Sequence, residues 1–223
     1  MAVEAHVTER SAESAARIQR HAGIDRLFHW VTAVAVLALL ATGLLPVVGV
    51  EFSWVTIHWM TGLVLTLLVL FHLVRSLFWQ RPKCMLIRPR DVSEALQAAR
   101  AKPGEPVRLP GKYTLAQKLM HLALGLAVVV AVVTGVIMLA KIDTPFWKRD
   151  PYLLAAGTWG VVYLLHGLAA LATLTLVMIH IYFGLLPEKR VYLRAMTRGW
   201  VTREELGAYH DLERWPGRRA GRS

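Results

Sequence analysis

Two long apolar segments of this sequence each carry two histidines fourteen residues apart, His58 with His72 and His166 with His180. Fourteen residues of helix span about 21 Å and return to within about 40° of the same face. One face of each helix would therefore place an imidazole near each side of a bilayer, whose hydrocarbon core is about 30 Å thick. Because a strongly polar side chain inside a membrane is costly, these histidines are predicted to form a functional site.

The histidines of the apolar segments fall into two groups by predicted depth. The outer group is His58 and His166, and the inner group, near the cytoplasmic side, is His29, His72, His121 and His180. This distribution fits two haems stacked across a helical bundle, each held by neutral imidazoles from two helices. Two axial protein ligands leave the iron no open position, which favours electron transfer over oxygen binding or substrate chemistry.

The residues alone leave the ligands of the inner haem open. His72 mirrors the geometry of the outer pair and would be the partner of His180, whereas His29 lies one turn inside the membrane and is the other candidate. His121 begins its apolar segment, so a headgroup-level histidine or the wall of a quinone pocket is expected there. No role is predicted for the histidines outside the apolar segments, His6, His21 and His210.

Four glycines accompany these histidines: Gly43, Gly62, Gly135 and Gly167. A missing side chain would let a flat macrocycle approach the helix backbone. Small residues also let membrane helices pack closely against each other. Both explanations are open for these glycines.

Four apolar runs are long enough to place the histidines across a membrane: about 27–50, 54–79, 115–140 and 153–186. The chain is 55% hydrophobic with a mean hydropathy of +0.43, and no Asp or Glu lies deep within a run, which is atypical of a soluble domain. The predicted fold class is all-α: an integral membrane four-helix bundle, one domain over residues 1–223, with two haems between the helices.

The charge distribution predicts the orientation of the bundle. Of 26 Lys and Arg residues, 23 fall on the side of the two termini and three on the other, with a net charge of +11. The positive-inside rule then makes both termini, the loop 80–114 and the tail 187–223 cytoplasmic. Anionic lipid is an expected partner, and nucleic acid is not, because no separate basic domain remains outside the spans.

The remaining segments limit the chemistry further. A single cysteine, Cys84, excludes a disulfide framework, a CxxC motif and a cysteine-ligated iron–sulfur cluster within this chain. The first 26 residues are polar without a cleavage signal, so the first span is expected to be retained. Residues 1–20 are expected to be helical or loosely ordered, and 91–101 to form a surface helix, followed at the end of the chain by an amphipathic tail.

Several strings resemble one family: IDRLFHW before the first span, GKYTLAQK before the third, IHIY at His180, and MTRGWVTREEL in the tail. In order and spacing they resemble the cytochrome b (gamma) subunit of membrane-bound formate dehydrogenases, over about Arg20 to Trp215. Cytochromes b of hydrogenases and of thiosulfate-type reductases share the four-span plan. The resemblance implies two haems b, the outer one ligated by His58 and His166 and the inner one by His29 and His180. His72 stays the alternative inner ligand.

The resemblance also implies a quinone site at the cytoplasmic end, near His180 and the GKYT-x-x-Q segment. Thr114, Gln117 and His121 are its candidates in this chain. The family pattern has Asn at the position of Thr114 and Gly at that of Ala116, so the resemblance does not assign the individual contacts to the quinone here.

The resulting expectation is a membrane-anchor subunit of a respiratory formate dehydrogenase in the bacterial inner membrane. It would pass electrons from an outer iron–sulfur subunit to menaquinone or ubiquinone, with proton uptake from the cytoplasm. Substrate oxidation would belong to a partner with molybdopterin or tungstopterin, so no catalytic residue is assigned here. The alternatives are a cytochrome b of a hydrogenase or thiosulfate-type reductase, a purely structural anchor, and a histidine-relay transporter. The transporter would require acidic residues and a broken helix within the spans.

Overall fold

The computed structural model describes residues 16–79, 84–102 and 104–215. The chain divides into two compact units, which are described separately. One comprises residues 27–80 and 121–182, and the other combines the segments 1–26, 81–120 and 183–223. The first unit holds most of the apolar runs, and the second holds most of the polar segments between and after them.

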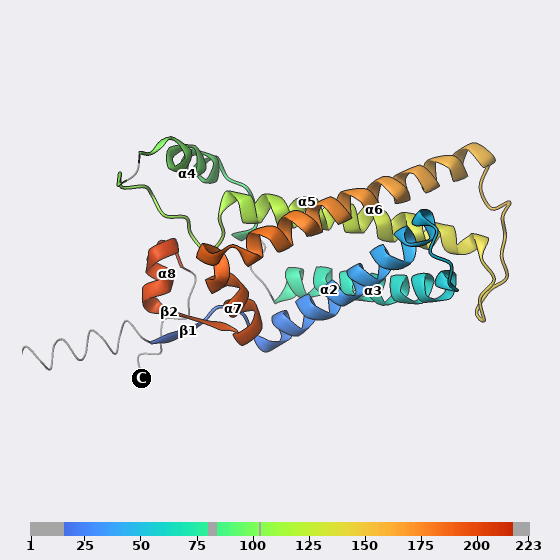
Figure 1. The fold of residues 1–223 in the computed structure, drawn as a ribbon, viewed down its shortest axis with the longest axis horizontal. Coiled ribbons are helices and arrows are strands. Elements are labelled where there is room, and N and C mark those ends of the chain that lie inside the picture. Colours follow the sequence, from blue (N-terminus) through green and yellow to red (C-terminus); the bar gives the residue numbers. More distant parts are fainter. Residues whose placement is uncertain (1–15, 80–83, 103, 216–223) are drawn as a thin grey trace, which may run out of the picture. The chain divides into compact units, whose positions relative to one another are not determined.

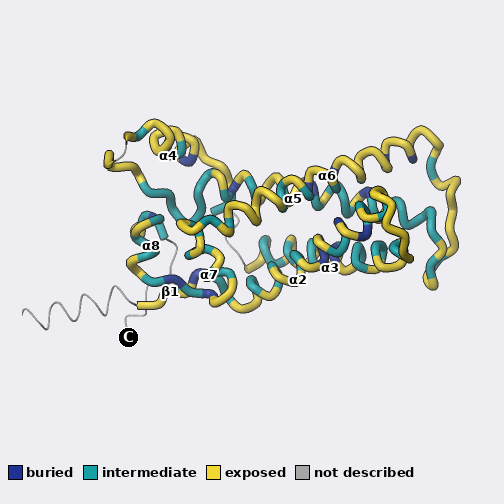
Figure 2. Tube along the Cα trace, viewed as in Figure 1, coloured by how far each residue is buried: buried dark blue, intermediate teal, exposed yellow. Residues whose placement is uncertain are grey.

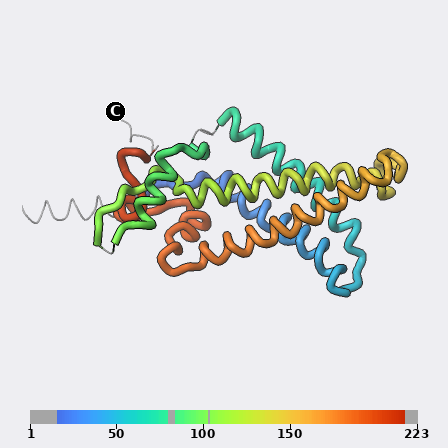
Figure 3. Tube along the Cα trace, turned by 90° about the horizontal axis from the view of Figure 1, so that it is seen from above, coloured from blue at the N-terminus to red at the C-terminus, as the bar shows by residue number. Residues whose placement is uncertain are grey.

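Four long helices form the apolar unit and run lengthwise in both views (Figures 1 and 3). They are α2 (Gly23–Leu44), α3 (Trp54–Phe78), α5 (Leu115–Met138) and α6 (Ala156–Leu185), with short 3₁₀ turns at Pro46–Val48 and Leu139–Lys141. In the described part of the chain, these four helices are long and apolar enough to cross a membrane, which confirms the predicted spans. A helix satisfies its own backbone hydrogen bonds, which lipid cannot do.

Many apolar residues on these helices are exposed, and Figure 2 shows exposed and half-buried residues along all four of them. Leu67, Leu126 and Val34 are about two-thirds exposed, on three different helices. In water such a surface would be an aggregation hazard, whereas in a bilayer it faces lipid tails. The chain is therefore a multi-pass membrane protein.

The core of the apolar unit lies halfway along the helices. Val36, Leu40 and Leu65 are buried together and are surrounded by partly buried apolar residues from all four helices. Leu65 is seven residues, or about two helical turns, from both His58 and His72. This apolar layer therefore separates the outer histidine level from the inner one.

The polar unit contains a short antiparallel strand pair that the all-α prediction did not include. β1 (Arg17–Gln19) pairs with β2 (Trp200–Thr202), with Ile18 opposite Val201. The expectation of helix or loose order up to residue 20 is wrong at β1, because pairing to β2 satisfies its backbone; residues 1–15 lie outside the described residues. The fold remains mostly helical.

Three helices complete the polar unit: α4 (Pro89–Arg100), α7 (Arg190–Arg198) and α8 (Arg203–Tyr209), with a 3₁₀ turn at Pro187–Lys189. α4 coincides with the predicted surface helix. A buried ion pair of 2.7 Å joins Asp91 on α4 to Lys118 in the first turn of α5, and Glu94 accepts from Arg214 of the tail at 2.7 Å. These contacts hold the loop, the tail and the start of α5 together.

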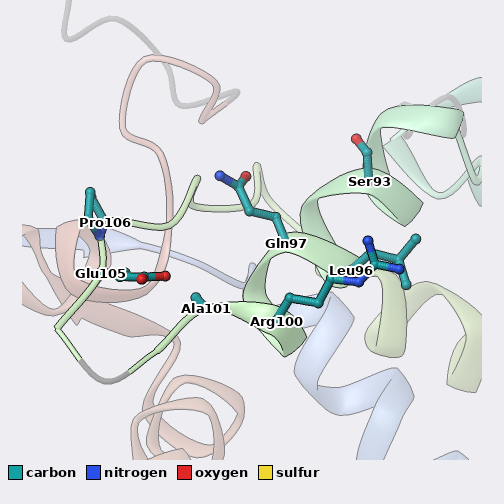
Figure 4. Close-up of a pocket in the computed structure, with 7 residues that line it drawn as sticks. All are labelled: Ser93, Leu96, Gln97, Arg100, Ala101, Glu105 and Pro106. Atoms are coloured by element: carbon teal, nitrogen blue, oxygen red, sulfur yellow. The ribbon is translucent and has the colours of Figure 1, made fainter.

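A hollow of about 470 Å³ lies along α4. Figure 4 shows Gln97 and Arg100 on the helix, with Glu105 and Pro106 on the segment that follows it. Its lining includes no histidine and none of the predicted site residues. The residues predicted to bind haem lie instead in the apolar unit.

Candidate functional site

The two outer histidines face each other across α3 and α6. The ring centres of His58 and His166 lie 6.2 Å apart, and their planes are inclined at 73°. Both rings are only partly exposed, and neither α3 nor α6 contains an Asp or Glu that could pair with them. The structure thus brings together the two residues that the sequence predicted as the outer pair.

Each outer imidazole is held by a threonine on the neighbouring helix. Thr42 Oγ1 of α2 lies 2.9 Å from His58 Nδ1, and Thr134 Oγ1 of α5 lies 2.9 Å from His166 Nδ1. Each threonine hydroxyl donates its one proton to a backbone carbonyl one turn earlier, at 2.7 Å for Ala38 and 2.6 Å for Val130. Its oxygen must therefore accept from Nδ1–H, so Nε2 keeps the lone pair that binds metal.

The residue after each threonine is a glycine that lies against the same imidazole. A Cβ on Gly43 would lie 3.4 Å from His58 Cε1, and one on Gly135 would lie 3.3 Å from His166 Cε1. A methyl group at Gly135 would therefore crowd the His166 ring, and one at Gly43 would just touch the His58 ring. For these two glycines the structure gives a third explanation besides macrocycle approach and helix packing, namely room for the imidazole.

The inner level contains two imidazole pairs. The ring centres of His29 and His180 lie 6.2 Å apart with planes inclined at 50°, and those of His72 and His121 lie 5.8 Å apart at 65°. Phe28 stacks nearly parallel on His72, with a ring separation of 5.1 Å. Of the two candidates for the inner ligand, His29 and not His72 is therefore opposite His180.

The two 6.2 Å pairs fit the requirements of iron between axial imidazoles. With a metal–nitrogen bond of about 2.0 Å and about 1.1 Å from nitrogen to ring centre, two imidazoles on one iron would have centres about 6.2 Å apart. His29 Nδ1 is buried without a hydrogen-bond partner among the described residues, so this ring has a nitrogen available to a bound group. In the same residues no cluster of three or more His, Cys, Asp or Glu could bind a metal directly. A porphyrin that brings four nitrogens of its own fits this donor set.

Comparison with protein families matches residues 20–199 to the family described as prokaryotic cytochrome b561. The chain belongs to this family. Membership implies haem b in the bundle, in agreement with the imidazole pairs, and confirms the resemblance noted in the sequence.

Two similar proteins narrow the comparison. The chain is 27% identical over 214 residues to the formate dehydrogenase cytochrome b556 subunit of Haemophilus influenzae. The aligned region covers 89% of this chain and 82% of that protein. It is 26% identical over 212 residues to the formate dehydrogenase cytochrome b556(fdo) subunit of Escherichia coli strain K12, covering 89% and 91%.

The residues predicted for the quinone region lie along the start of α5. Thr114 and Gln117 form a reciprocal cap: Thr114 N donates to Gln117 Oε1 at 3.0 Å, and Gln117 N donates to Thr114 Oγ1 at 3.2 Å. This cap begins the helix that carries His121 one turn later. The cap gives both residues a structural role, and it leaves the amide NH₂ of Gln117 outside the cap.

Sequence reasoning missed Thr42 and Thr134, although a signal was present. His29 and His121 are each followed thirteen residues later by a Thr-Gly pair, just as His58 and His166 are each followed fourteen residues later by another histidine. Spans one and two thus repeat in spans three and four. Searching for the shared offset would have identified both threonines.

Proposed function

We propose that this chain is the dihaem membrane subunit of a formate dehydrogenase-like complex in the bacterial inner membrane. In this proposal it carries electrons from an iron–sulfur subunit on the outer side to a quinone, with both termini in the cytoplasm. The observation that carries the proposal is the pair of 6.2 Å imidazole separations at two levels of one bundle. Family membership and the two formate dehydrogenase relatives support it.

In this proposal His58 and His166 hold the outer haem, and His29 and His180 hold the inner one. Iron between two imidazoles supplies a one-electron ferric/ferrous couple without an open position for substrate. The tautomer set by Thr42 and Thr134 would leave Nε2 of each outer histidine free to bind the iron. The apolar layer around Leu65 keeps water and ions out of the path between the two levels.

Electron delivery to the inner level requires a quinone that accepts electrons and protons there. His121 and Gln117 lie on the same face of α5, four residues apart, and provide a titratable imidazole and an amide donor. If protons enter from the cytoplasm while electrons arrive from outside, charge is separated across the membrane without a proton channel. Menaquinone and ubiquinone both meet this requirement.

The partners follow from the same reasoning. The span residues provide no ligands for an iron–sulfur cluster or a pterin cofactor, so substrate oxidation falls to other subunits, one with iron–sulfur clusters and one with molybdopterin or tungstopterin. The family includes more than formate dehydrogenases, so a hydrogenase or thiosulfate-type reductase is the alternative partner. Identifying the catalytic subunit that purifies with the chain from its native membrane distinguishes these partners.

A redox assay tests the function. The purified chain is reduced with dithionite, freed of excess reductant, and mixed with a short-chain quinone while the haem b absorption is followed. We expect reoxidation in the wild type and in the control Thr66→Val. Among the described residues, the Thr66 hydroxyl donates to the Gly62 carbonyl of its own helix. Absorption that persists after quinone is added, with haem fully retained, would contradict the quinone-reducing role.

A further inference from the structure

We propose that Thr42 and Thr134 are positioning residues that hold the outer imidazoles and lower the reduction potential of the iron between them. The inference rests on the proposed function, in which His58 and His166 ligate one haem. It adds two residues on two further helices to that site, which is then built by all four spans.

The contact between a threonine hydroxyl and an outer imidazole occurs twice. Both Thr–His hydrogen bonds have the same length, 2.9 Å, and both involve Nδ1. Both threonines also occupy the same place in the internal repeat, thirteen residues after His29 and His121 respectively. Two unrelated packing accidents would not share donor atom, length and register.

Both threonine hydroxyls lie in a buried environment. Thr42 and Thr134 are 6% and 5% exposed, so water cannot replace a lost partner of Nδ1. Each hydroxyl also donates to the carbonyl of Ala38 or Val130, which polarises its oxygen and strengthens it as an acceptor. Hydrogen bonds in such surroundings are stronger than in water and costly to leave unmade.

The chemical consequence follows from the tautomer. Donation from Nδ1–H to a polarised oxygen makes the imidazole more basic and Nε2 a better donor to the metal. A more electron-rich ligand favours ferric over ferrous iron and therefore lowers the reduction potential. The contrast with the inner level supports this role, because His29 Nδ1 has no such acceptor among the described residues.

The test compares midpoint potentials of the purified full-length chain carrying Thr134→Val, Thr42→Val, Thr134→Ser or the control Thr66→Val. Val replaces the hydroxyl by a methyl group of similar size, Ser keeps the hydroxyl, and Thr66 contacts no histidine in the described contacts. We expect each Val variant at Thr42 or Thr134 to raise the potential of one haem only. If the lost hydrogen bond weakens the preference for ferric iron tenfold, the midpoint potential of that haem rises by about 59 mV, the value for a one-electron couple.

Further readouts separate this inference from the proposed function. His166→Ala should remove the same spectral component that shifts in Thr134→Val, and Thr134→Ser should restore the wild-type potential. If His166→Ala removes no haem, the proposed function fails. If it does, but both Val variants titrate like Thr66→Val, the positioning role is overturned. Loss of haem in the Val variants also supports the role if the Ser and Thr66 variants retain it. Val exchanges the threonine hydroxyl for a methyl group, whereas Ser keeps the hydroxyl.

Discussion

The imidazoles of His72 and His121 lie 5.8 Å apart, centre to centre, and form a third pair within the apolar unit. The internal repeat relates this pair to His29 and His180, since His121 corresponds to His29 and His180 to His72. In the proposed function one of these two equivalent inner pairs holds a haem, and the other is left for a different task.

The first prediction concerns that third pair. We expect His121→Ala to retain both haems and to slow reoxidation by quinone about tenfold or more, because a positioned acid–base group is lost. Stopped-flow reoxidation of the reduced chain measures the rate, and a haem assay measures the content. A variant that loses one haem, or that reoxidises at the wild-type rate, would contradict this division of tasks.

The second prediction concerns space beside an outer ligand. Gly135→Ala places a Cβ 3.3 Å from His166 Cε1, closer than ordinary contact, so the ring must shift by a few tenths of an ångström and its hydrogen bond to Thr134 should weaken. Haem retention at the outer site should fall about tenfold. Gly125→Ala on the same helix meets nothing within 4 Å and is the control. Equal haem retention in the two variants, measured after detergent washing, would show that the imidazole does not need this space.

The third prediction concerns pH and the buried His210. This side chain is 1% exposed; Nδ1–H donates to Gly111 O at 2.6 Å, and Nε2 accepts from Arg20 at 3.2 Å. Burial and the nearby Arg20 charge lower the pKa of His210, more than the Gly111 hydrogen bond raises it. Below about pH 6.5 the unfolded chain then binds more protons, so the stability of the polar unit should fall with decreasing pH until His210 is protonated in the folded state.

Limited proteolysis of the tail at pH 7 and pH 5 measures this effect. We expect faster cleavage at pH 5 in the wild type and a smaller pH dependence in His210→Gln, which cannot titrate. The same pH dependence in both proteins would assign the effect to other groups.

The fourth prediction concerns the buried pair between Asp91 and Lys118. Burial raises the pKa of Asp91, but the hydrogen bonds from Lys118 and from the Arg88 backbone, together with the charges of both residues, lower it by more, so the pair is ionised. Lys118→Met leaves a buried carboxylate without its partner and should cost about 3 kcal/mol. The double variant Lys118→Met/Asp91→Leu should recover much of this. Hydrogen exchange of α4 measures the stability of the single and double variants. If the costs of the two substitutions simply add in the double variant, Asp91 and Lys118 are not energetically coupled.

Much of the fold follows from the sequence, because hydrophobic length and charge asymmetry are properties of single segments. The predicted spans agree with the helices within a few residues. The strand pair of Ile18 and Val201 did not follow, because it joins segments some 180 residues apart through backbone bonds that no local pattern announces.

Part of the candidate site could likewise be predicted from the sequence, and part could not. Helical spacing was sufficient to select His58 and His166, because depth in a membrane can be counted along the chain. It could not choose between His29 and His72, because that choice depends on which helices are neighbours. No role was predicted for His210 because it lies outside the spans, although it is buried and hydrogen-bonded to Arg20 and to the Gly111 carbonyl of the GKYT segment.

The most direct test of the dihaem assignment is the haem content of the purified chain by pyridine haemochrome, with each histidine of the apolar unit replaced by alanine in turn. The account predicts two haems b per chain in the wild type. It predicts one haem after replacement of any of the four ligands, His29, His58, His166 and His180, and two after replacement of His72 or His121. A chain without haem, or the loss of a haem in His72→Ala but not in His29→Ala, would contradict it.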